Sequence, residues 1–502
     1  MEKGSIRKIV AYVLAAIQFI VTIALVVQLI LTQMVPIEYL LIGSIVLIVL
    51  IIIVIISQKY TGTGIIAIMV SVMLILGMGY GNYMLYHTNW MIDKVTNVTV
   101  QVDTINLYVL NEDKAQSVED VVDYKIGILG AGDQKSTNEV VQSLEEELSV
   151  KLNISKYDAV TDLADALTDG SIQAIIINVG YISMLDDIEG YETFNTMLRI
   201  VSDRQIETEI VVENKEELPE IQGGYVPETF SVFISGIDTY GAVTTKDRSD
   251  ANIIATVNTK THQVLLLSTP RDFYVPLSIS NGKEDKLTHA GIYGIDVSMD
   301  TLEMLYGIEI DYYVRLNFTG FIDIVNALGG IDVDSEYAFT ALTGESYIQG
   351  TNHLNGERAL AFARERHAFK TGDLQRGKNQ MAVIQAVIKK AMSSDLLLNY
   401  AGVMDSIAGC FQTNMSNSMI GGLVQHQIQS GKGWNIVSYQ TNGSGSKKTC
   451  YSSRKKKTYV MIPNYDTVEQ AQTMIQQVLD GEILSETTEV PDGGSKKLLE
   501  CW

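Results

Sequence analysis

Three long apolar runs near the N-terminus constrain this chain more than any other feature of its sequence. They cover residues 9–31, 37–56 and 64–86. Each run approaches the ~20 residues that a helix needs to cross the hydrocarbon core of a bilayer. The first run is too long for the core of a signal peptide, and no small-residue cleavage site leads from it into soluble sequence. The sequence therefore predicts a membrane region with three transmembrane helices over residues 1–89.

Basic residues flank these runs unevenly. Lys3, Arg7 and Lys8 precede the first run, and Lys59 separates the second from the third, whereas the short loop 32–36 contains no Lys or Arg. Lys and Arg are enriched in the cytoplasmic loops of membrane proteins. We therefore expect the N-terminus to be cytoplasmic and everything after the third span to be extracellular, in a multi-pass protein of the cell membrane.

Composition narrows the possible partners. The chain has 502 residues, enough for two or three domains, and its formal net charge is -22. An anionic surface argues against nucleic acid as a partner, because binding to a phosphate backbone needs a spread of cations. The three cysteines, Cys410, Cys450 and Cys501, fit no zinc-binding spacing. Cys410 and Cys450 could form one disulfide outside the cell, and two unpaired thiols agree equally well with the sequence.

Residues 90–222 alternate between strand and helix patterns. Residues 124–130 and 171–181 have the pattern of buried strands, and residues 136–149 have helical spacing with a serine at their head. This alternation predicts a small α/β accessory domain with a partly parallel sheet. The glycines of GILGAGDQ do not match a dinucleotide-binding fingerprint, so a scaffold or spacer role is expected.

Residues 223–482 are predicted to form a second α/β domain, with a central mixed sheet flanked by helices. Candidate strands cover residues 229–238, 312–318 and 330–336, and residues 251–272 have the pattern of two strands joined by a polar turn. Amphipathic helices are expected over 296–309, 318–330 and 373–392. Polar residues follow several of these strands directly, which is where the sites of open α/β sheets usually lie. The tail, residues 483–502, is polar, and disorder is expected there.

Strong cations gather in this second domain against the acidic trend of the chain: Arg248, Arg271, Arg364, Arg366 and Arg376. Arginine presents a planar fork of donors that suits phosphate oxygens. Asp238 and Asp250 supply the oxygen ligands that Mg²⁺ prefers when it also binds a substrate phosphate. Together these residues suggest a pyrophosphate site. Each aspartate could equally be a turn residue, and Arg248 could form an ordinary surface ion pair.

Spacing supports convergence of part of this set. Arg364 and Arg366 point apart on a helix but to the same side of an extended chain, so we expect the helix that begins near Asn355 to end by Arg364. Arg376 and Gln380 are four residues apart and share one face of the next helix. Arg376 also lies in the first turns of that helix, where the helix dipole favours an anion.

Several ordered motifs resemble those of the LytR-CpsA-Psr (LCP) family. They are SGIDTYG with DRSD, STPRD, H-A-G-x-x-G, NALGGIDV, and LNGERALAFARER with GDLQRGKNQ. The match covers roughly residues 223–392, and the three spans and intervening domain look like the CpsA-like branch. The family attaches capsule, teichoic acid or related glycans, carried on a polyprenyl pyrophosphate lipid, to peptidoglycan outside the cell.

The resemblance implies a role for each matched residue. Asp238 and Asp250 are expected to hold Mg²⁺, or Mn²⁺, beside the pyrophosphate, and with Arg248 and Arg271 to form the catalytic group. The residues expected to bind the pyrophosphate are Arg248, Arg271, Arg364, Arg366, Arg376 and Gln380. The implied partners are the lipid-linked glycan, peptidoglycan and the cell membrane. The family's lipid tunnel would suit residues 324–328 and 383–388, although spacing alone predicts ordinary core at both.

The expected reaction is attack of an acceptor hydroxyl, on a peptidoglycan sugar, at the sugar-proximal phosphorus. Such a step depends mostly on positioning and charge neutralisation. Asp238 is the candidate base; His289 is a second candidate, for which packing is the simpler interpretation. Two alternatives stay open from the sequence: a pyrophosphohydrolase acting on polyprenyl pyrophosphate, and a non-catalytic envelope regulator or lipid-binding protein.

Overall fold

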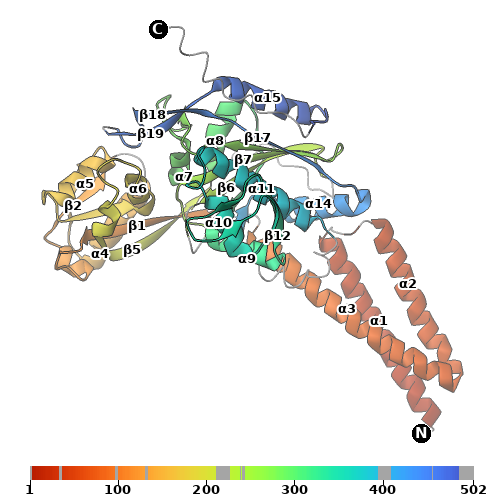
Figure 1. The fold of residues 1–502 in the computed structure, drawn as a ribbon. Helices are drawn as coiled ribbons and strands as arrows, with labels where there is room; N and C mark the ends of the chain where they lie inside the picture. Colours follow the sequence, from red (N-terminus) through yellow and green to blue (C-terminus); the bar gives the residue numbers. More distant parts are fainter. Residues whose placement is uncertain are drawn as a thin grey trace.

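The computed structural model describes residues 3–32, 35, 37–95, 100–130, 134–210, 226–237, 239, 243–393, 407, 409–454 and 456–485. Figure 1 shows three parts along the molecule. A bundle of long helices projects from one end, a smaller α/β unit lies at the other end, and a larger α/β unit lies between them. The domain boundaries stay a prediction, because two of them fall near residues outside the described ranges.

Three helices near the N-terminus are long and apolar enough to cross a membrane, as predicted. They are α1 (Lys3–Thr32), α2 (Ile37–Ile56) and α3 (Thr61–Val95), and η1 (Ser57–Lys59) links the last two. Much of their apolar surface is exposed, as at Ile20 and Met73. Inside the bundle, Ser71 Oγ donates a 2.7 Å hydrogen bond to Gln18 Oε1. Buried polar contacts of this kind hold helices together where lipid offers no hydrophobic driving force.

The smaller unit contains a five-stranded sheet in the order β3-β2-β4-β1-β5. Its strands are β1 (Val100–Leu110), β2 (Lys125–Leu129), β3 (Asn153–Tyr157), β4 (Ala174–Asn178) and β5 (Leu198–Glu209), and its helices are α4 (Gln134–Leu148), α5 (Val160–Thr168), α6 (Val179–Leu185), η2 (Val118–Val121) and η3 (Phe194–Met197). β2 pairs in parallel with β3 and β4, and β1 is antiparallel to β4 and β5. Apolar clusters cover both faces of β4, which explains its uninterrupted apolar sequence. A small α/β unit with a partly parallel sheet was predicted, and this is confirmed.

Two details of that prediction are wrong. The strand expected over residues 171–181 ends at Asn178, because the Asn178 side chain accepts a hydrogen bond from the Gly180 amide and caps α6. The helix expected to start at Ser136 starts two residues earlier. Ser136 lies inside α4, where its hydroxyl donates to the buried carboxylate of Asp103.

The larger unit is built on a six-stranded sheet in the order β16-β11-β6-β7-β8-β17. The strands are β6 (Thr229–Ile237), β7 (Ser249–Asn258), β8 (Gln263–Thr269), β11 (Tyr312–Leu316), β16 (Phe411–Thr413) and β17 (Asn435–Gln440). The pairs β6–β11 and β8–β17 are parallel and the other pairs are antiparallel, so the sheet is mixed, as predicted.

Helices cover both faces of this sheet. On one face, α8 (Ile295–Tyr306) and α15 (Tyr465–Leu479) pack on Phe233 and Ile254; on the other, α11 (Asp373–Ala391) and α14 (Asn417–Ser430) pack on Val232 and Ile253. The remaining elements are α7 (Ala290–Tyr293), α9 (Phe318–Ala327), α10 (Gly356–Arg364), η4 (Leu287–His289) and four two-stranded sheets, β9 (Tyr274–Pro276) with β10 (Glu284–Lys286), β12 (Ile331–Ser335) with β15 (Gly350–Leu354), β13 (Phe339–Thr340) with β14 (Ser346–Tyr347), and β18 (Gly443–Thr449) with β19 (Lys457–Pro463).

Candidate functional site

One cavity of about 670 Å³ brings together seven of the residues that the sequence singled out: Arg248, Asp250, Arg271, Arg364, Arg366, Arg376 and Gln380. They reach it from four places: the start of β7, the segment after β8, the end of α10 and the first two turns of α11. The eighth, Asp238, lies outside the described residues. The cavity lies where the sheet meets α9, α10 and α11.

The end of α10 aims two arginines at the cavity. The helix ends at Arg364, and Glu365 has an extended backbone (φ −67°, ψ 128°), so the chain leaves the helix between Arg364 and Arg366. The guanidinium carbon of Arg364 lies 4.1 Å from the centre of the Phe318 ring. This contact orients the guanidinium, since a cation is attracted to the face of an aromatic ring.

Arg376 belongs to the first turn of α11, whose first residue is Asp373. Its Nη2 lies 3.3 Å from Asp373 Oδ1, and the Arg376 side chain is 10% exposed. Burial and the neighbouring Arg271 together lower the pKa of Arg376 below its ordinary value. An anion in the cavity would offset the repulsion between the two guanidinium groups.

Asp250 and Arg271 form a buried ion pair in the cavity wall. Arg271 Nη1 donates to both carboxylate oxygens of Asp250, at 3.0 and 2.8 Å. The side chains are 9% and 15% exposed for Arg271 and Asp250 respectively. Burial alone would raise the pKa of Asp250, but Arg271 and Arg376 more than offset it, so the pKa lies below its usual value. Asp250 is therefore a carboxylate at neutral pH.

Asp250 has the chemistry of a magnesium ligand. Among the residues that the structure describes, no group of three or more His, Cys, Asp or Glu side chains could hold a metal ion. Mg²⁺, however, is commonly held by one or two carboxylates together with substrate phosphates. One carboxylate at an arginine-lined cavity fits a cation of that kind.

The rest of the cavity lining is largely apolar: Ile234, Ile237, Leu316, Phe318, Phe321, Ile322, Leu360, Val383 and Ile384. Of the two apolar segments expected to suit a lipid tunnel, residues 383–388 contribute their first two side chains. Residues 324–328 do not line the cavity; Val325 and Leu328 pack in an adjoining core that also contains Val383. The cavity therefore offers an apolar interior and a group of guanidinium cations in one space.

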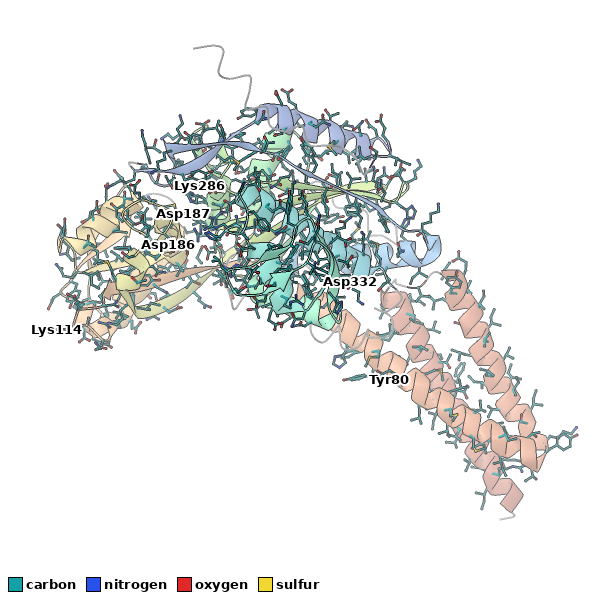
Figure 2. The ribbon with its side chains drawn as sticks, viewed as in Figure 1. Tyr80, Lys114, Asp186, Asp187, Lys286 and Asp332 are labelled. Carbon is teal, nitrogen blue, oxygen red and sulfur yellow. The ribbon has the colours of Figure 1, made fainter. Side chains whose placement is uncertain are left out.

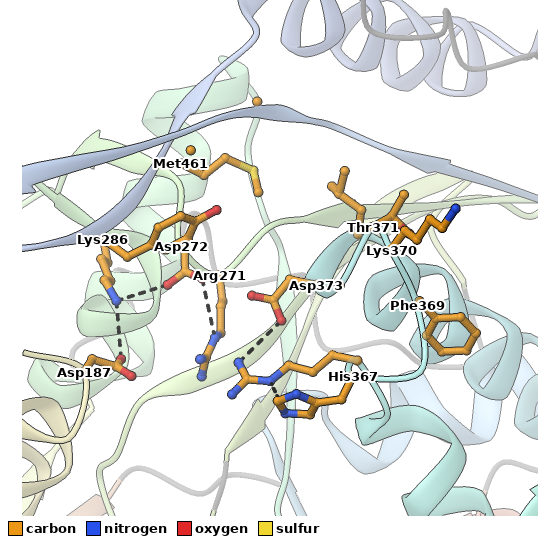
Figure 3. A pocket seen from close by; sticks show the side chains of 16 residues that line it. Asp187, Arg271, Asp272, Lys286, His367, Phe369, Lys370, Thr371, Asp373 and Met461 are labelled. Carbon is orange, nitrogen blue, oxygen red and sulfur yellow. Dashed lines mark hydrogen bonds and ion pairs between the residues drawn. The ribbon is translucent and has the colours of Figure 1, made fainter. Parts of the chain in front are cut away.

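A second, more polar cavity of about 660 Å³ adjoins the first (Figure 3). Asp187, Arg271, Arg366 and His367 line both cavities. In the second cavity, Lys286 Nζ lies 3.2 Å from Asp272 Oδ1 and 3.4 Å from Asp187 Oδ2. Arg271 and Arg366 thus lie at the boundary between the largely apolar cavity and the polar one.

Two further carboxyl groups lie in this polar cavity. Burial raises the pKa of Asp272 above its ordinary value. Burial would also raise the pKa of Asp373, but Arg376 and Arg271 together with smaller contributions outweigh it, and the pKa is lowered. The two carboxyls therefore have different affinities for a proton while lining the same space.

Sequence reasoning missed four of these residues: Asp187, Asp272, Lys286 and Asp373. Asp272 follows Arg271 in STPRD, and Asp373 lies three residues before Arg376, so neighbourhood in the sequence was a usable signal for both. Asp187 belongs to the smaller unit, and nothing in its local sequence indicates a contact with residues far along the chain.

His289, the second candidate base, is buried. Its Nδ1 lies 2.7 Å from Asp285 Oδ1 and its side chain is 1% exposed. Ser452 Oγ lies 3.0 Å from the same nitrogen. Neither cavity is lined by His289, and this geometry favours the packing role. Cys410 and Cys450 are both buried and unbonded to each other.

The fold and the site together define a class: an α/β protein that carries three membrane-length helices and a cavity lined by arginines and apolar side chains. The LytR_cpsA_psr family model matches residues 196–476. The chain belongs to the LytR-CpsA-Psr family.

Among its relatives, the chain is 38% identical over 194 residues to the polyisoprenyl-teichoic acid–peptidoglycan teichoic acid transferase TagU of Bacillus mycoides (strain KBAB4). That match covers 38% of this chain and 62% of the relative, so this chain spans about three fifths of the relative's length. A protein of the same name from Enterococcus faecalis (strain ATCC 700802 / V583) is 36% identical over 229 residues, covering 42% and 74% of the two chains. The crystal structure of B. subtilis TagV has 30% identity and a TM-score of 0.43, and covers 50% of this chain and 98% of its own.

Proposed function

We propose that this chain is a membrane-anchored phosphotransferase that moves a glycan polymer, such as capsular polysaccharide or teichoic acid, from a polyprenyl pyrophosphate carrier to peptidoglycan. The observation that carries the proposal is the cavity of about 670 Å³, whose lining combines apolar side chains with five arginines. The apolar part suits a prenyl chain, and guanidinium groups suit the pyrophosphate. The names of the relatives, which act on polyisoprenyl-linked teichoic acid and peptidoglycan, support the same chemistry.

In the proposed reaction, an acceptor hydroxyl forms a bond to the sugar-proximal phosphorus, and the bond from that phosphorus to the prenyl phosphate breaks. Polyprenyl phosphate leaves, and the hydroxyl proton passes to a base, for which Asp238 is proposed. The arginines bind the phosphate oxygens and neutralise charge as the leaving group departs. Such cations act strongly because they are fixed in a largely buried site.

Asp250 and Asp238 are proposed to hold Mg²⁺, with Mn²⁺ as a substitute. The cation would supply charge neutralisation at the pyrophosphate. Asp250 would then divide its oxygens between the cation and Arg271, which keeps the arginine beside the phosphates. Arg271 contacts both carboxylate oxygens of Asp250, so a bound cation would have to share that carboxylate with it.

The membrane orientation is also a proposal: N-terminus in the cytoplasm, both α/β units outside. Basic residues before α1 and at Lys59 support it through the positive-inside rule. The N-terminus lies at the end of the bundle far from the larger unit (Figure 1). If the bundle crosses the bilayer, the N-terminus and the larger unit lie on opposite sides of the membrane.

Product analysis tests the proposed function. Purified full-length protein is incubated with lipid-linked glycan, Mg²⁺ and peptidoglycan, and both the lipid and the polymer are followed. We expect polyprenyl phosphate and peptidoglycan-bound glycan to appear together. If the glycan is cleaved from its lipid but never appears on peptidoglycan, the protein is a pyrophosphohydrolase and not a transferase. If the lipid is bound but not cleaved, the protein is a lipid-binding protein without transferase activity.

A further inference from the structure

A carboxylate of the smaller unit reaches into the arginine site of the larger unit. Asp187 follows α6, and its Oδ2 lies 3.1 Å from Arg248 Nη1 and 3.4 Å from Lys286 Nζ. Figure 2 shows Asp187 and Lys286 at the junction of the two units, and Figure 3 shows the ion pair between them. Lys286 is buried, with a side chain 3% exposed, and Asp272 Oδ1 contacts it from the other side at 3.2 Å. Asp187 therefore bridges Arg248 to a lysine that a second carboxyl group also holds.

The backbone around Asp187 is fixed to the larger unit. Thr458 Oγ1 donates a 2.8 Å hydrogen bond to the Asp187 carbonyl oxygen, and Ile188 forms a β-bridge with Thr458. Burial alone would raise the pKa of Asp187, but Lys286 and Arg248 lower it well below its ordinary value. Asp187 is therefore ionised, and its backbone is hydrogen-bonded to the larger unit beside the site.

The smaller unit also holds the backbone that leads to Arg248. The Val102 amide of β1 donates to the Thr244 carbonyl, and the Lys246 amide donates to the Val102 carbonyl, both at 2.9 Å. Lys246 Nζ lies 3.1 Å from Asp103 Oδ2, with side chains 9% and 1% exposed. A buried ion pair of this kind is costly to break, because one partner is left charged and unpaired.

We propose that Asp187 is a positioning residue for phosphoryl transfer, through which the smaller unit sets the places of Arg248 and Lys286. The inference rests on the proposed function. Without the Asp187 carboxylate, Lys286 keeps its contact with Asp272, but Arg248 loses the contact that links it to Lys286, and the two cations repel each other. Asp187 also reduces the positive charge that an incoming pyrophosphate meets. The residue therefore weakens anion binding while it fixes the geometry that the reaction needs.

The family model does not cover this feature. It begins at residue 196, after Asp187 and Asp103. The arrangement therefore joins the part of this chain that precedes the matched region to residues inside it. It assigns that part a role in the site, where the sequence alone indicated a scaffold or spacer.

The test uses full-length protein in detergent and the variant Asp187→Asn. Affinity for inorganic pyrophosphate is measured as inhibition of lipid binding, and turnover is measured by glycan transfer. We expect pyrophosphate to bind about fourfold more tightly, the effect of one unit charge at ~5 Å across water. We expect kcat to fall by roughly tenfold to a hundredfold, as misplaced groups do in a positioned site.

Glu189→Gln is the matched control. Glu189 pairs with Lys447 across the same junction at 2.6 Å, but the side chains are 78% and 63% exposed and line neither cavity. We expect wild-type affinity and turnover from it.

A purely structural role for Asp187 would lower affinity, turnover and thermal midpoint together in Asp187→Asn, and that result overturns the inference. Unchanged pyrophosphate affinity also overturns it, whether or not the wild-type protein transfers glycan. Absence of transfer by wild-type protein instead counts against the proposed function, while tighter pyrophosphate binding by the variant still reports on Asp187.

Discussion

Arginine and aspartate side chains in this protein act as pairs whose geometry matters more than their number. Arg271 contacts both oxygens of Asp250 and lines both cavities, so it joins the proposed metal ligand to the proposed phosphate site. The sequence predicted that these residues belong to one site. It did not predict their pairing, because a contact between residues 21 positions apart depends on how β7 and β8 meet.

The variant Arg271→Lys tests the need for a forked donor. Lysine keeps the charge beside Asp250 but presents a point cation in place of a planar group. It also avoids leaving Asp250 buried and unpaired, which would cost about 3–5 kcal/mol of stability. We expect glycan transfer to fall by roughly a hundredfold, the size of effect seen when one fixed charge-stabilising donor is lost.

Arg358→Lys serves as the control for that variant. Arg358 lies on α10 and is half-buried, and its guanidinium donates to the carbonyl oxygens of His353 and Ser346. It lines neither cavity. Its transfer rate is expected to match that of the wild type. Equal rates in Arg271→Lys and wild type would show that a charge alone suffices at position 271.

Asp250→Asn tests the proposed cation. An amide keeps the shape of the side chain but loses the charge that binds Mg²⁺. We expect wild-type transfer to stop when the metal is chelated and to return with Mg²⁺, and the variant to need a higher Mg²⁺ concentration for its residual rate. Titration of transfer against Mg²⁺ measures both. Full activity of either protein in excess chelator would show that glycan transfer does not need a metal ion.

At the scale of secondary structure, the sequence predicted those helices that bury one apolar face. The helices over α8, α9 and α11 were predicted because their apolar residues recur at helical spacing. The end of α10 at Arg364 followed from the need to aim two arginines together. The strand expected over residues 171–181 was too long. The buried helix α6 is as apolar as the buried strand β4 before it, and only the Asn178 cap marks where the strand ends and the helix begins.

The apolar side of α10 is predicted to meet the prenyl chain. Ala361 lines the cavity and is only partly buried, so Ala361→Trp would fill cavity space without displacing the core. We expect weaker binding of a long polyprenyl phosphate and little change for inorganic pyrophosphate, since only the former needs the apolar space. Competition binding with prenyl phosphates of increasing length measures this. If Ala361→Trp weakens the binding of all prenyl phosphates and of pyrophosphate equally, the prenyl chain does not lie beside α10.

At the scale of the whole molecule, three units are arranged so that the membrane bundle and the smaller unit lie on opposite ends of the larger one (Figure 1). Separate units were predictable from composition and periodicity. The contact of Asp187 with Arg248 was not, because it joins residues 61 positions apart in different units. Only tertiary packing creates such a contact, and periodicity within one element carries no information about it.

Orientation is tested by labelling single cysteines in intact cells. Lys114→Cys places an exposed thiol on the smaller unit, far from the bundle in Figure 2, and is expected to react with a membrane-impermeant maleimide. Tyr60→Cys, between α2 and α3 and 65% exposed, is expected to react only after permeabilisation. Cys410 and Cys450 are buried, and Cys501 is replaced by serine in both variants. The reverse pattern would place both α/β units in the cytoplasm.

The central claim is that the cavity between the sheet and α9–α11 holds a polyprenyl pyrophosphate lipid by its phosphates and its chain together. The most direct measurement is a crystal structure of the protein with the lipid that copurifies with it, identified in parallel by mass spectrometry. The account predicts a prenyl chain beside Val383 and Ile384, with its phosphates at Arg271 and Arg376. A lipid phosphate bound away from these arginines, or a cavity closed by side chains while the lipid binds elsewhere, would contradict it.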